Sequence, residues 1–594
     1  MKRTIPAILF CLGLNSPGNA KSPTTAAMVS RETGSSRPNV IVILSDDQGY
    51  GDFSCHGNPV LKTPALDKLH NESIRFGNFH VAALCTPTRG QLMSGLDAMH
   101  NKAATVLAGR NLMRRDIVTM PEVFSNNGYA TGIFGKWHLG DNYPDRPMDR
   151  GFQKCIWHKG WGLLSEIEYD NDYYETRYLD SLETKQSGEY CTNLWFNKSI
   201  EWMDEMAEKN QAFFTYLALN APHGPFYSPA QDYNFYRYQV NDSATASFFG
   251  MIRNIDRNMA RLDDWLEKTN LKKNTLVIFM TDNGGTGGVE LYNAGMRDKK
   301  GSNYDGGHRA ACFMRWPNGN FGDSRTVSSA SQIQDLLPTF IDLFGLKLQN
   351  DYQFDGQSLK NVLFGEEANS NRMFVVQQGI PVKFGGCVVR GSWRLVGENE
   401  LYNMDNDPSQ QKSVATNYPE IYSSMRSFYE DWWKKIEPGI NQFVPVVIGS
   451  PKENPVIFNS NNWVDGAVNT QWKVAQAGGD PKGGISHLHI AENGKYKIEL
   501  SRWPFHLQRS LTSVGPKTSV GGAEIRSGKS VPIHFGCVSL NNSNPVLSES
   551  KVGATAISFE MEIRAGDNTF QAWFKNKEGK DICGAYYVKV ERLF

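Results

Sequence analysis

The sequence predicts a layered α/β domain, followed by a smaller α+β unit and an all-β module. Four short apolar runs predict the α/β domain, because continuous runs of this length are typical of strands buried on both faces of a parallel sheet. The runs are residues 40–44, 131–134, 213–219 and 276–280. Helical patterns lie between them, for example at residues 120–127 and 245–268. This alternation of strands and helices predicts a sheet layered with helices.

A change of pattern near residue 372 predicts the second unit. Three short strand-like segments occupy residues 373–377, 387–390 and 393–396. A turn-rich link at residues 401–410 and an amphipathic helix at residues 419–435 follow them. We therefore expect residues 372–440 to form a small α+β subdomain, after an α/β domain that covers residues 38–371.

Strand patterns and frequent turns mark the last part of the chain. The strand patterns occur at residues 495–500, 555–563 and 586–590. Short strands separated by turn signals are typical of sandwiches and barrels. We expect residues 445–594 to form an all-β accessory module, a sandwich, with most of its tryptophans in the core. These tryptophans are Trp463, Trp472, Trp503 and Trp573.

The composition argues against two classes of protein. The chain carries 62 Lys and Arg against 62 Asp and Glu, whereas a general nucleic-acid binder carries a basic surplus. Its apolar runs stay shorter than the ~20 residues of a membrane span. We therefore expect no nucleic-acid partner and no transmembrane segment.

The first 20 residues have the pattern of a secretory signal peptide. Lys2 and Arg3 precede an apolar run over residues 5–14, and small residues lead to a cleavage point at Ala20. The alternative is a frayed N-terminal helix. Residues 21–37 are rich in Ser, Thr, Ala and Arg, and we expect them to form a disordered leader. This pattern predicts an exported protein, periplasmic or extracellular.

Polar residues follow each of the four apolar runs of the α/β domain. The runs end in Ser45-Asp46-Asp47, Gly135-Lys136-Trp137-His138, Asn220-Ala221-Pro222-His223 and Thr281-Asp282-Asn283. In parallel α/β sheets the ligand site lies beyond the carboxyl ends of the strands. The gathering of carboxylate, ammonium and imidazole groups at that edge therefore indicates an enzyme.

The acidic strand ends indicate a metal site. Asp46 and Asp47 follow a buried strand, where carboxylates are costly without a compensating cation. Asp282 and Asn283 follow another strand and add further oxygen atoms. Carboxylate and amide oxygens without cysteine or histidine partners suit Ca²⁺ or Mg²⁺ better than Zn²⁺. The alternative is that Asp46 and Asp47 only cap a turn.

Cys85 precedes a predicted helix over residues 89–96. Pro87 suits the first turn of that helix, so a group at position 85 faces its positive end, which favours an anion. The alternative is a buried structural cysteine.

The string C-T-P-T-R-G at residues 85–90 resembles the signature of type I sulfatases, the arylsulfatase-like family of the alkaline phosphatase superfamily. The string G-K-W-H-L-G at residues 135–140 resembles the second signature of that family. The resemblance extends over most of residues 38–440. It implies an alkaline phosphatase-like fold, in which helices sandwich a large mixed sheet.

The resemblance also implies a nucleophile and a metal. Cys85 is then oxidised to Cα-formylglycine by a formylglycine-generating enzyme. The hydrate of this aldehyde has two hydroxyls, of which one attacks sulfur and the other later allows sulfate to leave. One Ca²⁺ is implied, bound by the modified residue together with Asp46, Asp47, Asp282 and Asn283.

Further roles follow from the same resemblance. Arg89 holds the modified residue, and His138 hydrogen-bonds it. Lys136, His223 and Lys300 contact the sulfate. Lys300 is chosen over Lys299 because it directly precedes the family-like string G-S-N-Y-D-G-G. We expect His223 to act as the acid that protonates the leaving group, and His138 as the base of the second step.

The leading hypothesis is a sulfatase that hydrolyses sulfate esters on sulfated glycans. One alternative is a phosphonate monoester or phosphodiester hydrolase of the same superfamily, and another is a non-catalytic glycan-binding protein. Five residues near the motifs are candidates for contacts with a sugar at the pocket mouth, although each is also compatible with a surface or core position. They are His100, Arg110, Trp157, His158 and Trp161.

Overall fold

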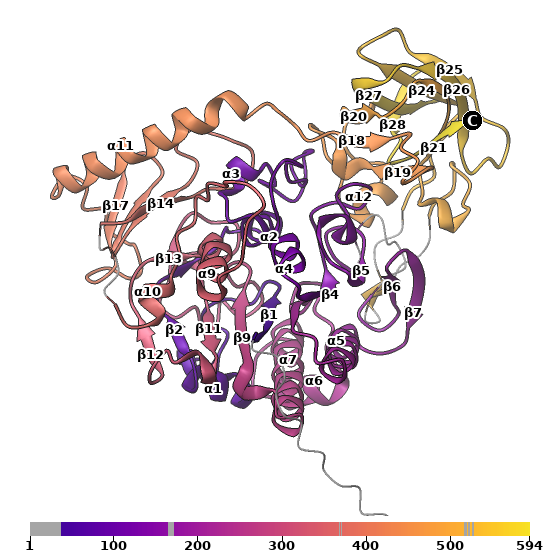
Figure 1. Cartoon of the computed structure of the whole chain (residues 1–594). Helices are drawn as coiled ribbons and strands as arrows, with labels where there is room; N and C mark the ends of the chain where they lie inside the picture. Colours follow the sequence, from indigo (N-terminus) through magenta and orange to yellow (C-terminus); the bar gives the residue numbers. More distant parts are fainter. Residues whose placement is uncertain are drawn as a thin grey trace, which may run out of the picture.

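The structure is a computed structural model that describes residues 37–593, except 164, 166–171, 367–368, 370, 516–518, 521–522 and 525–527. The predicted signal peptide and residues 21–36 of the predicted leader lie outside the described residues. Figure 1 shows a large α/β body, a smaller unit that carries α11 (Pro419–Ile436), and a yellow all-β module at the C-terminal end. No helix in the described part of the chain combines the length and the apolar character needed to cross a membrane.

The α/β body is built on one ten-stranded sheet. Across the sheet the strands are β12 (Arg325–Val327), β2 (Ile74–Phe76), β11 (Cys312–Arg315), β9 (Thr275–Thr281), β1 (Asn39–Ser45), β8 (Phe213–Ala218), β4 (Ala130–Lys136), β5 (Lys154–His158), β6 (Thr176–Asp180) and β7 (Glu183–Ser187). The five central strands, β9 to β5, are parallel. Antiparallel pairs flank them on both sides. The prediction of a large mixed sheet is therefore confirmed.

Helices cover both faces of the sheet, because alternate residues of a strand point to opposite faces. Ile41 and Ile43 of β1 share a core with α1 (Pro64–Asn71), α5 (Cys191–Glu208) and α7 (Ser243–Lys268). Val42 and Leu44 share the opposite core with α2 (Cys85–Ser94), α4 (Met120–Asn126) and α9 (Leu336–Phe344). The apolar run of β1 is thus buried on both sides, as predicted.

Strand register places the polar strand ends at one edge. Ser45 of β1 is paired with Thr281 of β9, so Asp46 and Asp282 leave the sheet side by side. Leu44 is paired with Ala218, and Ala218 with Gly135. Lys136 therefore lies at the same level, two strands from β1.

The start of α2 differs from the prediction. The helix begins at Cys85 itself and ends at Ser94, instead of covering residues 89–96. Gly95 ends the helix because it adopts a left-handed conformation with φ of 67°, which glycine adopts without steric cost. Cys85 is thus the first helical residue.

The smaller unit is a four-stranded antiparallel sheet covered by α11. Its strands are β14 (Met373–Val376), β15 (Cys387–Arg390), β16 (Trp393–Val396) and β17 (Glu400–Asn403). Leu395 and Leu401 of the sheet pack with Met425 and Tyr429 of α11. The expected link at residues 401–410 was wrong in its first part, because residues 401–403 belong to β17. Pairing with β16 buries Leu401 and Tyr402.

The C-terminal module is a sandwich of two sheets. One contains β18 (Val446–Ile448), β20 (Ser486–Ile490), β27 (Gly566–Lys575), β24 (Phe535–Leu540), β25 (Val546–Glu549) and β28 (Asp581–Gly584). The other contains β19 (Val456–Asn459), β29 (Tyr587–Leu593), β21 (Gly494–Ser501) and β26 (Ile557–Ile563). Both contribute to one core. Trp463, Trp503 and Trp573 are buried, as expected for most of the module's tryptophans, whereas Trp472 is half-buried.

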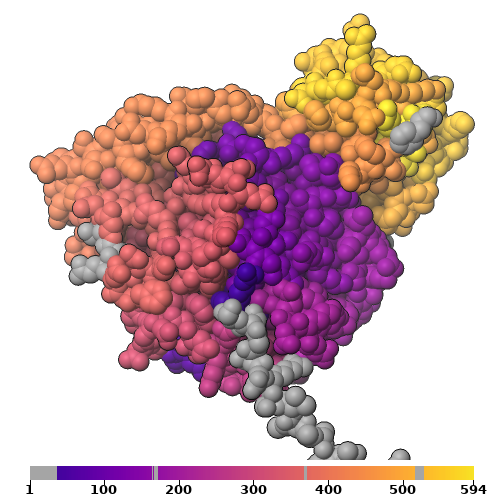
Figure 2. All heavy atoms as spheres, viewed as in Figure 1, coloured from indigo at the N-terminus to yellow at the C-terminus, as the bar shows by residue number. Residues whose placement is uncertain are grey.

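The module lies directly against the α/β body, as the space-filling view shows (Figure 2). Leu112 of the α/β body belongs to the core of the module. Asn142 donates a hydrogen bond of 3.0 Å to the Ile457 carbonyl, and Arg115 donates one of 2.6 Å to the Pro445 carbonyl. The two parts thus share both apolar and polar contacts.

The remaining elements are short. The helices are α3 (Ala98–Asn101), α6 (Ala230–Tyr236), α8 (Asp305–His308), α10 (Lys360–Leu363) and α12 (Gln471–Ala475), and the strands are β3 (Phe79–His80), β10 (Arg309–Ala310), β13 (Ser331–Gln332), β22 (Ser519–Val520) and β23 (Ala523–Glu524).

Candidate active site

The loops after β1 and β9 form one acidic cluster. Asn283 donates a hydrogen bond of 3.0 Å to Asp47 Oδ1, and the Asp47 backbone N–H donates one of 3.0 Å to Asp282 Oδ1. Carboxylate oxygens of Asp46 and Asp282 lie within 4.8 Å of each other and of the Cys85 sulfur. All these side chains are buried. The structure thus brings together the four predicted metal ligands and the predicted nucleophile.

Three cationic side chains surround the acidic cluster. Lys136 Nζ donates to Asp46 Oδ2 at 2.6 Å, and Arg89 Nη2 donates to Asp282 Oδ2 at 3.0 Å. Lys300 forms an ion pair with Asp47. Lys299 lies outside the cluster, because its ammonium pairs with Glu290 and its side chain is 56% exposed. Of the two neighbouring lysines, Lys300 is therefore the one that contacts the acidic cluster.

The two buried carboxylates of Asp46 and Asp282 have opposite pKa shifts. Burial alone raises the pKa of Asp46, but the charges of Lys136 and other neighbouring cations outweigh it and hold this pKa well below its ordinary value. Burial and the nearby Asp46 charge raise the pKa of Asp282 to about 7, despite Arg89. A cation between the two carboxylates favours the ionised form of both.

Two buried oxygen atoms of the cluster have no hydrogen-bond partner among the residues that the structure describes. They are Asp46 Oδ1 and Asn283 Oδ1. A buried polar atom left unpaired costs about 1–3 kcal/mol. A hard cation that takes six to eight oxygen ligands, such as Ca²⁺, satisfies such atoms. The donor set therefore fits a calcium ion.

His138 lies beside the predicted nucleophile. Its Nδ1 is 3.5 Å from Cys85 Sγ, and its Nε2 is 2.9 Å from Thr86 Oγ1. Cys85 is buried and, like the other cysteines of the described residues, forms no disulfide. His138 and Asp47 have φ angles of 60° and 68°, a region that is uncommon for residues other than glycine. Such strained backbone is often found at functional sites.

The accessible side of the site lies at His223 and Lys300. Their side chains are each 19% exposed, whereas those of Lys136 and Arg89 are fully buried. His223 Nδ1 donates to the Gly224 carbonyl at 2.7 Å, so Nε2 faces Asp47 Oδ2 at 3.7 Å. Burial lowers the pKa of His223. A ligand therefore meets His223 and Lys300 before it reaches the deeper cations.

Three contacts of the site were not predicted. Tyr216 of β8 lies 3.3 Å from Arg89 Nη1, Thr86 contacts His138, and Tyr173 donates to the His223 carbonyl at 2.6 Å. These hydroxyls contact the Arg89 guanidinium, the His138 ring and the His223 backbone. A tyrosine inside an apolar strand and a threonine beside the cysteine gave no pattern by which to find them.

Four of the five candidates for the pocket mouth lie elsewhere. Trp157 is buried in the core. His158 is buried too. Both of its ring nitrogens have partners within the fold: Nδ1 donates to the Lys159 carbonyl, and Nε2 accepts from Asn220 Nδ2 at 2.8 Å. His100 pairs with Asp355 at 3.0 Å, and Arg110 donates to the Ile440 carbonyl. These four side chains serve structural contacts.

Trp161 is the candidate that does lie at the site. Its ring centroid is 5.4 Å from that of His223. Its indole N–H donates to the Asn469 carbonyl of the C-terminal module at 2.7 Å. Ser165 forms a β-bridge with Thr470, in the same stretch of the chain. The module therefore supports the segment that carries Trp161 to the site.

Comparisons with known proteins find similarity to sulfatases. The sulfatase family profile matches residues 38–346. Arylsulfatase J of Mus musculus is 27% identical over 390 residues, which are 63% of this chain and 64% of that protein. N-acetylgalactosamine-6-sulfatase of Rattus norvegicus is 27% identical over 356 residues, 54% of this chain and 65% of that protein. The crystal structure of Ps i-CgsB in complex with k-i-k-neocarrahexaose has a TM-score of 0.62 at 25% identity, over 67% of this chain and 92% of that chain.

The chain therefore belongs to the sulfatase family, as a type I sulfatase of the alkaline phosphatase superfamily. The resemblance seen in the two sequence signatures is confirmed. The chain spans just under two-thirds of the length of the two curated relatives, 64% and 65%.

Proposed function

We propose that this protein is an exported sulfatase that hydrolyses sulfate esters on sulfated carbohydrate. The observation that carries the proposal is the buried cluster in which Cys85, three carboxylates and the cations Arg89, Lys136 and Lys300 converge. Export is proposed from the N-terminal pattern of residues 1–20, and it places the protein in the periplasm or outside the cell.

The site has the donors for the two groups that the family uses. Asp46, Asp47, Asp282 and Asn283 would hold one Ca²⁺, together with residue 85. Cys85 would be converted to Cα-formylglycine by a formylglycine-generating enzyme. When bound there, the ion would supply Lewis-acid chemistry that activates a hydroxyl of the hydrated aldehyde as a nucleophile at neutral pH.

Residues of the chain itself bind and orient the sulfate. Lys300 and His223 stand at the accessible side, and Lys136 lies deeper. A buried ammonium that is already in position stabilises negative charge without further reorganisation. We infer that Lys136 and Lys300 exchange part of their contact with Asp46 and Asp47 for contact with sulfate oxygens.

The two histidines are positioned for separate proton transfers. His223 lies at the accessible side, where the leaving alcohol departs, so we assign it as the acid that protonates this oxygen. His138 lies next to residue 85 and away from the opening. We assign it as the base that removes a proton from residue 85 when sulfate is released.

Carbohydrate is the favoured substrate class for two reasons. One relative is named for N-acetylgalactosamine, and the structure of another holds neocarrahexaose. The ring of Trp161 lies beside His223 at the site, where an indole face is able to pack against a sugar ring.

Two alternatives remain to be separated from this proposal by experiment. A phosphonate monoester or phosphodiester hydrolase of the same superfamily requires turnover of phosphorus esters. A non-catalytic glycan-binding protein has no use for a buried nucleophile among charged residues.

The test uses the purified full-length mature protein, made in a host with a formylglycine-generating enzyme and supplied with Ca²⁺. It is assayed with an aryl sulfate, an aryl phosphonate monoester and a diaryl phosphate. We expect the highest kcat/KM with the sulfate. A higher value with either phosphorus ester would favour the first alternative, and no turnover of any ester would favour the second.

A further inference from the structure

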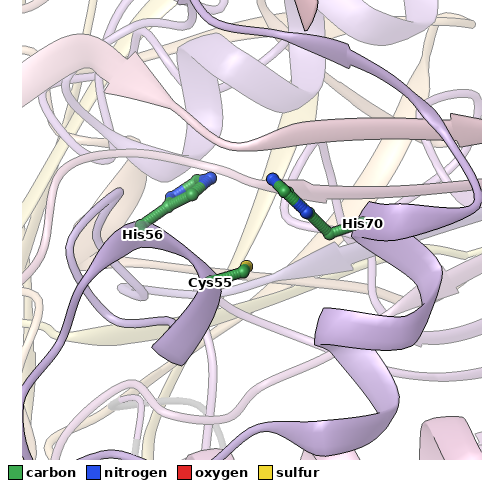
Figure 3. A group of neighbouring side chains, drawn as sticks. All are labelled: Cys55, His56 and His70. Atoms are coloured by element: carbon green, nitrogen blue, oxygen red, sulfur yellow. The ribbon is translucent and has the colours of Figure 1, made fainter. Parts of the chain in front are cut away.

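A second group of metal-ligating side chains lies outside the candidate active site. Cys55 and His56 belong to the short helix η1 (Ser54–His56), and His70 lies in the last turn of α1. One potential ligand atom from each side chain lies within 4.8 Å of the other two, and all three residues are half-buried. Figure 3 shows the two imidazole rings pointing toward each other, with the Cys55 side chain below them.

The hydrogen bonds of the two histidines leave one nitrogen of each ring available. His56 Nδ1 lies 2.6 Å from the Tyr50 carbonyl, which only accepts, so Nδ1 carries the proton of the neutral ring. His70 Nδ1 lies 3.0 Å from Asn71 Oδ1 in the same way. Each Nε2 therefore has a free lone pair, and the outer ring nitrogens face each other in Figure 3. A metal-ligating histidine characteristically holds its other N–H on an oxygen.

The backbone around Cys55 is held by a small polar network. The Cys55 backbone N–H donates to Asp67 Oδ1 at 3.0 Å. Thr63 donates to the same oxygen at 2.9 Å, and Ser54 donates to Asp67 Oδ2 at 2.6 Å. Asp67 belongs to α1, so this network fixes η1 against the helix that carries His70. The three side chains are thus presented from a connected frame.

We propose that Cys55, His56 and His70 bind a zinc ion, separate from the calcium site of the catalytic cluster. One thiolate and two imidazole nitrogens are the donors that Zn²⁺ prefers, whereas Ca²⁺ prefers oxygen. Zn–N distances of ~2.0–2.1 Å and a Zn–S distance of ~2.3 Å place tetrahedral ligand atoms about 3.3–3.6 Å apart. Because the three ligand atoms already lie within 4.8 Å of one another, side-chain rotation closes the remaining gap of at most roughly 1.5 Å. A water molecule takes the fourth position.

Zinc binding replaces the proton on the Cys55 sulfur with Zn²⁺. The Cys55 S–H bond breaks, the proton leaves to solvent, and the sulfur lone pair forms the bond to Zn²⁺. Both histidines bind in their neutral form, so they release no proton. Because the ion joins η1 to α1, it stabilises the segment that follows the Asp46 and Asp47 loop.

The test measures metal binding directly and does not depend on sulfatase activity. Cobalt(II) serves as the spectroscopic probe for zinc, because a thiolate ligand adds a charge-transfer band in the near ultraviolet. The full-length protein carries Cys85→Ala, so that the active-site thiol cannot contribute, and excess Ca²⁺ occupies the oxygen site. We expect about one cobalt ion per chain with the thiolate band, and displacement of that ion by zinc.

Variants then assign the band. Cys55→Ser should remove it, and His56→Ala and His70→Ala should each weaken cobalt binding at least tenfold. The matched controls Cys155→Ser and His534→Ala should retain it. Circular dichroism without metal checks that each variant is folded. The proposal is overturned if the parent protein shows no thiolate band, or if the band persists in folded Cys55→Ser.

Discussion

Lys136 Nζ lies 2.6 Å from Asp46 Oδ2, and the two side chains are 0% and 1% exposed. Lys136 ends β4, and Asp46 follows β1, two strands away in the sheet. The register of the strands places these two ends at the same level. Taking two charges out of water costs several kcal/mol per ion, and a buried pair of this kind often contributes little net stability. A role in binding an anion therefore explains this buried ion pair at the carboxyl edge of the sheet better than a contribution to stability does.

Removal of Lys136 should destabilise the metal-free protein. Lys136→Ala leaves the Asp46 carboxylate buried without its hydrogen-bonded partner, with Arg89 3.9 Å away, so we expect a loss of about 3 kcal/mol, the lower part of the range for a broken buried pair. Urea unfolding in chelator measures this loss. Lys154→Ala is the control, because its pair with Asp180 is over one-third exposed and should be worth less than about 1 kcal/mol. Equal losses would contradict the assigned electrostatics.

Removal of a metal ligand should affect calcium and activity together. Asp47→Ala should lower the bound calcium measured by atomic emission and abolish most sulfate ester hydrolysis, with the fold retained by circular dichroism. Asp116→Ala, at a carboxylate with 74% exposure, is the matched control and should behave like the parent. Turnover at the parent rate by Asp47→Ala would rule out this residue as a ligand of a required metal.

The acidic cluster that we propose as a calcium site was predictable because the pattern is local to the strand ends. Asp46-Asp47 and Asp282-Asn283 directly follow strands that are buried on both faces, and the pairing of Ser45 with Thr281 brings the two loops together. The sheet class followed from the same apolar runs. By contrast, β17 was missed, because residues 401–403 precede a turn-rich stretch and become a strand only by pairing with β16.

Contacts between distant parts of the chain were not predictable from local pattern. The bond from Trp161 to the Asn469 carbonyl joins residues 308 positions apart. His158 was expected as a pocket candidate from its position near the motifs, but its two ring nitrogens are satisfied inside the fold by Lys159 and Asn220. Tertiary contacts of this kind leave no periodic signal in the sequence.

The two neighbouring lysines should differ in their effect on catalysis. Lys300→Ala should lower kcat/KM for an aryl sulfate by roughly 10²–10³-fold, the range for loss of one group that stabilises transition-state charge. Lys299→Ala, whose ammonium pairs with Glu290 at the surface, should stay within about twofold of the parent, as expected for an exposed pair of little energetic weight. Steady-state kinetics measures kcat/KM of both variants. Similar losses in the two would mean that the assignment of Lys300 is wrong.

Trp161 should affect carbohydrate substrates alone. Trp161→Ala should raise KM for a sulfated oligosaccharide roughly two- to tenfold, because a ring contact is worth about 0.5–1.5 kcal/mol. KM for a small aryl sulfate should not change. Trp161→Phe keeps a ring but loses the hydrogen bond to the Asn469 carbonyl, so an intermediate value is expected. An equal rise in KM for both substrates in Trp161→Ala would indicate a general distortion of the site instead.

The most direct test of the account is the mass of the peptide that contains residue 85, measured alongside activity. In mature protein from a host with a formylglycine-generating enzyme, we expect an aldehyde in place of the Cys85 thiol, trapped by a hydrazide reagent. The specific activity of different preparations should rise in proportion to the aldehyde fraction. Cys85→Ser, which offers a single hydroxyl, should not turn over. Full turnover by protein whose residue 85 is an unmodified thiol would contradict the proposed mechanism.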